Sequence, residues 1–91
     1  MRALIIIYEF NNTVINNRTP FETRIRQYDQ YAFISKNACM IFTNDSVVSV
    51  RDYLNAAMTS GDKIYVGEAN APAAWNNLHN DVSEYLQRNL K

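Results

Sequence analysis

Cysteine and histidine occur once each in this chain of 91 residues, which also holds only two glycines and two prolines. One cysteine excludes a disulfide framework, and one cysteine with one histidine cannot assemble a zinc site. Two glycines, Gly61 and Gly67, are too few for a glycine-rich phosphate loop. The lone Cys39 lies in an apolar run, so we expect an unreactive core residue and a reducing compartment.

Net charge is also lacking, because nine basic and nine acidic residues cancel. This balance argues against a surface that attracts nucleic acid as a whole. The longest apolar run, Ala3 to Phe10, is far shorter than the roughly 20 residues that span a bilayer, and no signal-peptide cleavage site follows it. We therefore expect a cytoplasmic single domain over residues 1–91 that makes no membrane contact.

Apolar spacing and turn residues predict an alternation of strands and helices. A capping box from Thr19 to Glu22 and a cap at Asn44-Asp45-Ser46 mark two helix starts. The predicted elements are a strand over 3–10, a helix over 20–30, strands over 31–35 and 38–43, a helix from 47 to 61, a strand over 63–68 and a helical tail over 70–91. The tail is predicted as one helix or two, since asparagines at 76, 77 and 80 can divide it.

This order of elements is that of a ferredoxin-like βαββαβ sandwich of the α+β class. Right-handed crossovers then predict a four-stranded antiparallel sheet in the order 4-1-3-2, with both main helices on one face. The apolar face of the tail needs a surface to cover, either the other face of its own sheet or a partner chain. We predict a homodimer, with an interface formed by Ile64, Tyr65, Val66, Trp75 and Tyr85.

The first strand ends in a carboxylate, Glu9, within an otherwise apolar segment. In the 4-1-3-2 order the end of strand one lies beside the start of strand four, so an ion pair between Glu9 and Lys63 is expected. The alternative is a chemical role for Glu9 as a metal ligand. Hydrolysis by a metal ion normally needs several converging acids, and Asp45 and Asp62 are already explained as a helix cap and a turn residue. No metal site is predicted.

Three arginines, Arg18, Arg24 and Arg26, are the only clustered basic residues in the sequence. They would contact phosphates rather than bases, which predicts weak and strongly salt-dependent binding to nucleic acid. His79 is expected to be a solvated surface residue. Asp81 follows it by two positions and would point to a different side of a helix.

The hydrophobic first strand ends in Tyr8-Glu9-Phe10. On a ferredoxin-like chain of this length, this motif resembles the small CRISPR adaptation subunit, the Cas-two family, and its relatives the VapD-type toxins. The resemblance implies a homodimer, and in some members a metal-dependent nuclease with an aspartate at the position of Glu9. It also implies an arginine-rich helix in members that scaffold DNA, of which only Arg24 and Arg26 are present here.

Two functions follow from these observations. The favoured one is a small homodimeric interaction or scaffold protein that binds a protein partner without a cofactor, such as one encoded by a phage or mobile element. The alternative is a metal-dependent endonuclease or endoribonuclease that uses Glu9 and a divalent ion. Because the chain offers one strand-end carboxylate and a lysine to neutralise it, we expect no efficient enzyme. The partner's identity stays open.

Overall fold

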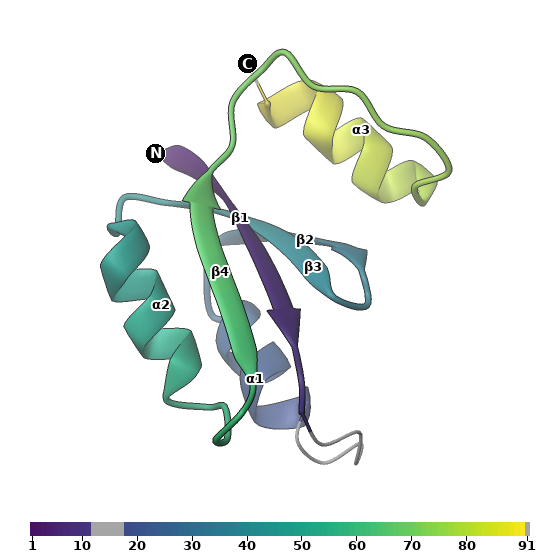
Figure 1. Cartoon of the computed structure of the whole chain (residues 1–91). Helices are drawn as coiled ribbons and strands as arrows, with labels where there is room; N and C mark the ends of the chain where they lie inside the picture. The colour runs from purple at the N-terminus through teal and green to yellow at the C-terminus, as the bar shows by residue number, and fades with distance from the viewer. Residues whose placement is uncertain (12–17, 91) are drawn as a thin grey trace.

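The computed structural model describes residues 1–11 and 18–90, and it shows an α+β fold (Figure 1). Positions 12–17, which lie between the predicted first strand and first helix, are outside the described residues. The elements are β1 (Arg2–Glu9), α1 (Arg18–Ile25), β2 (Gln30–Ser35), β3 (Ala38–Thr43), α2 (Val47–Asn55), β4 (Lys63–Glu68) and α3 (Asn80–Asn89).

The four strands form one antiparallel sheet in the order β2-β3-β1-β4. Counted from the β4 edge, the same order is 4-1-3-2. The strands β2 and β3 are joined at Lys36-Asn37 and pair as antiparallel neighbours, as the sequence predicted. The central strand β1 pairs with β3 on one side and with β4 on the other, so the end of β1 is held between two partners.

One face of the sheet, called the first face here, packs against α1 and α2. Alternate residues of β1 point to it, because side chains of a strand alternate between faces. The core on this face includes Leu4, Ile6 and Tyr8 from β1, with Phe21 and Ile25 from α1 and Val50 and Leu54 from α2. Both main helices therefore cover the same face, as predicted.

The opposite, second face is covered in part by the C-terminal segment. Its core holds Met40 and Phe42 of β3 against Leu86 of α3, and Trp75 packs beside them. The indole Nε1 of Trp75 donates to Ser83 Oγ at 2.8 Å, which ties the irregular segment to the helix. Figure 1 shows α3 set apart from α1 and α2. The tail thus covers its own sheet, which was one of the two predicted alternatives.

The predicted start of the tail helix at 70–72 is wrong. Residues 69–79 have no helical structure, and α3 begins only at Asn80. Within that segment Asn77 has a φ of 62°, in the left-handed region that asparagine tolerates and a continuing helix excludes. The tail therefore contains a single helix, and Trp75 and Leu78 pack from a loop.

The predicted bounds of α1 and its capping box are also wrong. The helix already includes Arg18, so Thr19 is a helical residue and not its cap. It ends at Ile25 because β2 begins at Gln30, and a tight turn joins them in which Tyr28 N donates to Ile25 O at 3.2 Å. The length of α1 is therefore set by the start of β2, which pairs with β3, and not by the apolar spacing that predicted a longer helix.

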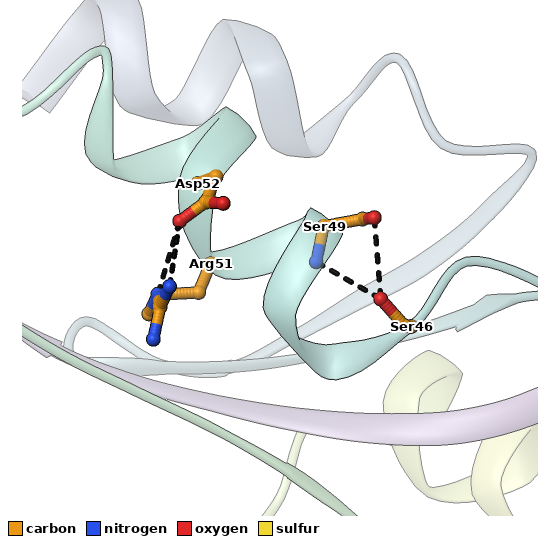
Figure 2. Close-up of polar contacts among 4 residues, drawn as sticks. All are labelled: Ser46, Ser49, Arg51 and Asp52. Atoms are coloured by element: carbon orange, nitrogen blue, oxygen red, sulfur yellow. Dashed lines mark hydrogen bonds and ion pairs between the residues drawn. The ribbon is translucent and has the colours of Figure 1, made fainter.

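The start of α2 is as predicted, and Figure 2 shows its cap. Ser46 Oγ accepts a hydrogen bond from Ser49 N at 3.1 Å, which satisfies a backbone donor that the first turn leaves free. The helix ends at Asn55, earlier than the predicted stop at Gly61, and turns follow. Gly61 has a φ of 90°, a conformation that favours glycine and reverses the chain toward β4.

Candidate interaction surface

The end of β1 lies beside the start of β4, as the sequence predicted. Glu9 and Lys63 are cross-strand partners, and Lys63 Nζ lies 3.3 Å from Glu9 Oε1. Both side chains are mostly exposed, at 66% for Glu9 and 78% for Lys63. The predicted ion pair is confirmed, and it occupies the carboxylate that the nuclease alternative requires as a metal ligand.

Two apolar side chains next to this ion pair are exposed on the second face. Ile7 is 51% exposed and Tyr65 is 61% exposed, and they are direct cross-strand partners in β1 and β4. They belong to the face that the C-terminal segment covers only in part, and neither is a member of the two buried clusters in the described parts of the chain. We call Ile7 and Tyr65 together the sheet-end patch.

A shallow groove of about 350 Å³ runs along this end of the sheet. It is lined by residues of β1 and β4 and by one residue of the β2–β3 turn, namely Ile7, Tyr8, Glu9, Asn37, Lys63, Ile64 and Tyr65. The backbone N–H of Tyr8 donates to Asn37 O at 3.0 Å, which holds the turn against β1. One corner of the sheet therefore brings together the apolar side chains of Ile7 and Tyr65, the ion pair of Glu9 and Lys63, and the exposed side-chain amide of Asn37.

Tyr65 lies across Gly67 of its own strand. A Cβ atom placed on Gly67 would be 2.9 Å from Tyr65 Cε1 and from the Tyr65 hydroxyl oxygen. Glycine at this position thus provides the space in which the tyrosine ring lies over the strand. The ring is held against the sheet while remaining exposed to solvent, which suits a contact surface.

The other predicted interface residues have partners within the chain. Ile64 and Val66 pack against the core on the first face, whereas Trp75 and Tyr85 pack against the core on the second. The Tyr85 hydroxyl also donates to Gln30 Oε1 at 3.2 Å, and burial raises the pKa of Tyr85 above its usual value. The five residues do not form one patch, and Tyr65 is the member that is exposed.

The three arginines that were predicted to bind phosphate contact different neighbours within the chain. Each guanidinium lies over an aromatic ring, with carbon-to-centroid distances of 5.2 Å for Arg18 over Phe10, 4.6 Å for Arg24 over Tyr53 and 5.1 Å for Arg26 over Phe33. Such contacts are each worth about 0.5–1 kcal/mol at exposed sites. The arginines therefore have structural roles, and they face α2 and the β2–β3 hairpin rather than one common point.

Hydrogen bonds also hold the side chains of Arg18 and Arg24 in place. Arg18 Nη1 donates to Lys36 O at 2.9 Å and its Nη2 donates to Asn37 Oδ1 at 3.2 Å, so this arginine braces the β2–β3 turn. Arg24 Nη1 donates to Tyr53 O at 2.5 Å and links α1 to the end of α2. These contacts use donors that would otherwise be free for phosphate oxygens.

The two other acids that were considered beside Glu9 have structural roles of their own. Asp62 is a turn residue, as predicted, because its carboxylate accepts from Thr59 N at 2.8 Å and from Asn11 N at 2.6 Å. Asp45 precedes the true cap, Ser46. Among residues 1–11 and 18–90, no group of three or more histidine, cysteine or carboxylate side chains could hold a metal ion.

The single histidine caps α3. His79 Nδ1 accepts from Asp81 N at 3.3 Å and lies 3.8 Å from Asp81 Oδ2. The expectation that Asp81 points away from His79 is wrong, since His79 lies outside the helix and turns back over its first residues. Both side chains are largely exposed, so the pair stabilises a helix end at the surface.

Two buried ionisable groups lie on the first face. Cys39 is fully buried, as predicted, and burial raises the pKa of its thiol to about 12. Burial also raises the pKa of Tyr8 well above its usual value, with Cys39 and Glu22 adding to the effect. The Tyr8 hydroxyl has no hydrogen-bond partner in the described part of the chain. Sequence reasoning missed this group, because an alternating strand pattern shows burial but not bonding.

Comparison with models of protein families finds no match to this chain, and comparison with curated proteins finds none either. The resemblance to the Cas-two family accordingly stays a prediction from Tyr8-Glu9-Phe10 and the order of elements. No helix in the described ranges is both long and apolar enough to cross a bilayer.

Proposed function

We propose that this chain is a small homodimeric interaction protein with a ferredoxin-like fold of the Cas-two type, which acts by binding a protein partner. The observation that carries the proposal is the sheet-end patch, in which Ile7 and Tyr65 are more than half exposed on a sheet face that the C-terminal segment covers in part. Apolar side chains that are exposed together and flanked by polar ones are typical of protein contact surfaces.

The chemistry at the corner of the sheet favours binding over hydrolysis. Glu9 has a lysine partner at 3.3 Å, and the described ranges hold no group of three or more histidine, cysteine or carboxylate side chains that could bind a metal ion. The exposed ring of Tyr65 is an amphipathic group of the kind that is enriched at protein interfaces. We therefore assign Ile7 and Tyr65 to partner contact and Glu9 and Lys63 to the polar rim around it.

Sedimentation velocity at micromolar concentration tests the homodimer, which we expect for the wild-type chain. A monomer at tens of micromolar would exclude it. Partner binding is tested by affinity capture from an extract of the source cells, with the wild type compared with Ile7→Lys. Tyr31→Ser is the matched control, because Tyr31 is an exposed tyrosine on β2, away from the patch.

We expect one protein to be retained by the wild type and by Tyr31→Ser and lost with Ile7→Lys. A lysine in the patch leaves a charge that must be desolvated on binding, which costs affinity. Capture of the same proteins by all three variants would show that the sheet-end patch does not bind the partner.

A further inference from the structure

The two edges of the sheet differ in their ability to accept another strand. On the β2 edge the pairing with β3 shifts register between Phe33 and Ser35, and α3 packs against β2. Such irregularities protect an edge from further pairing. The strand β4 instead pairs with β1 through six consecutive residue pairs from Lys63 to Glu68, and in the described ranges no strand lies on its outer side.

The direction of the backbone groups in β4 follows from one hydrogen bond. Ala69 N donates to Ala3 O at 2.9 Å, so Ala69 directs its peptide groups toward β1. In an antiparallel ladder, every second residue exchanges hydrogen bonds with the same neighbour. The register therefore turns Lys63, Tyr65 and Gly67 toward β1, and it leaves the N–H and C=O groups of Ile64, Val66 and Glu68 directed outward.

A second copy of β4 can satisfy all of these outward groups. A two-fold axis perpendicular to the sheet pairs residues that point to the same face. With Val66 opposite Val66, the outward residues Ile64 and Glu68 also pair with each other, and each pair exchanges two hydrogen bonds. With Tyr65 opposite Tyr65, Glu68 loses its outward partner and lies opposite Asp62, which places like charges together.

Side chains favour the same register. On the second face it sets Tyr65 of each copy opposite Gly67 of the other, where that copy's own Tyr65 ring already lies over the glycine. The two tyrosine rings become diagonal neighbours, within reach of each other at roughly 7–8 Å.

We infer that two copies of this chain join their β4 strands edge to edge, with Val66 opposite Val66, to form one continuous sheet. The inference rests on the proposed homodimer and names the surface that makes it. It also brings the two sheet-end patches next to each other across the two-fold axis, so that Ile7 and Tyr65 of both copies form one apolar strip for the protein partner.

Val66→Pro tests the inference directly. Proline lacks the N–H group that Val66 directs outward, whereas the hydrogen bonds between β4 and β1 do not use that group. Tyr65, the preceding residue, is already in the extended conformation that a following proline requires. Val66→Ala is the matched control, since it removes side-chain atoms from the same core position and keeps the N–H group.

We expect the wild type and Val66→Ala to sediment as dimers, and Val66→Pro to sediment as a monomer with an unchanged far-ultraviolet circular dichroism spectrum. A folded Val66→Pro variant that still forms dimers as tightly as Val66→Ala would overturn the edge pairing and leave the homodimer itself intact. A wild type that is monomeric would instead reject the proposed homodimer.

Hydrogen exchange of the wild type provides a second test that needs no variant. The amides of Ile64, Val66 and Glu68 should exchange at least ten times more slowly when the concentration is raised until dimers predominate. The amides of Tyr65 and Gly67, which bond to β1, should be protected at every concentration. Fast exchange of the first three amides in a dimeric sample would show that the dimer uses another surface.

Discussion

Glu9 and Lys63 face each other across β1 and β4, with 3.3 Å between the carboxylate Oε1 and the ammonium Nζ. This contact joins the last residue of one strand to the first residue of its neighbour. Because both side chains are mostly exposed, water and salt screen their attraction. The pair therefore contributes modestly to folding.

Glu9→Ala is expected to lower the free energy of unfolding by about 0.5 kcal/mol, the typical value for an exposed ion pair. In a domain of this size, that loss lowers the melting temperature by about 2–4 °C. Calorimetry of Glu9→Ala, Lys63→Ala and the double variant measures the coupling. Cleavage of RNA or DNA by the wild type with magnesium or manganese, abolished in a folded Glu9→Ala variant, would support the nuclease alternative.

Replacement of Arg18, Arg24 and Arg26 by alanine should weaken binding to single-stranded RNA and duplex DNA and reduce the salt dependence of binding. We expect the wild-type affinity to be weak already, since these guanidinium groups lie over aromatic rings. Binding isotherms at several salt concentrations measure both effects. Arg51→Ala is the control, because Arg51 pairs with the neighbouring Asp52 on α2 (Figure 2). Unchanged binding in the triple variant would refute the assignment.

Leu86→Ala should lower the free energy of unfolding by about 2–4 kcal/mol, because Leu86 is the buried residue of α3 in the core on the second face. Chemical denaturation measures this loss. Val48→Ala on the exposed side of α2 should change stability by less than about 0.5 kcal/mol. Equal effects of the two substitutions would mean that α3 does not pack on the sheet in solution.

Asp62 should make stability depend on pH in the acid range. Its slight burial raises the pKa of the carboxyl, but hydrogen bonds from Thr59 and Asn11 outweigh this effect and lower the pKa below its usual value. A group with a lowered folded-state pKa adds stability above its unfolded pKa of about 3.9, and this contribution disappears as the pH falls through the folded value.

Asp62→Asn should therefore be less stable than the wild type near pH 6, and its melting temperature should fall less steeply below about pH 5. Thermal denaturation from pH 6 to pH 2.5 measures the difference. Glu84→Gln, at an exposed position of α3, controls for the loss of one surface charge. Parallel pH profiles for the wild type and Asp62→Asn would contradict the role of the turn.

The sequence predicted the strands β3 and β4 to the residue, because each is a short apolar run that ends at turn residues. It also predicted the contact between Glu9 and Lys63, which follows once the order of strands is known. The tail was predicted less well. Trp75 and Leu78 have the spacing of a helix, yet they pack on the second face from a loop. The spacing of apolar residues shows that their side chains are buried, but it does not show whether the backbone that carries them is helical.

The arginines show a second limit of the sequence. Arg24 lies in the last turn of α1, whereas Arg26 follows the end of the helix, and their guanidinium groups lie over Tyr53 and Phe33 respectively. Two arginines that are close in the sequence therefore contact different elements, α2 and β2. The outward peptide groups of β4 could not be predicted either, because they depend on the register between β4 and β1 and not on the residue types.

The buried thiol of Cys39 makes the protein its own reporter of opening. It lies in the core between the sheet and the helices α1 and α2, with its pKa raised to about 12, so a thiol reagent can reach it only when this core opens. The labelling rate then measures how often the sheet and these helices separate, without any introduced probe. Comparing that rate in the wild type and in Leu86→Ala would reveal whether the C-terminal segment and the sheet open together or in sequence.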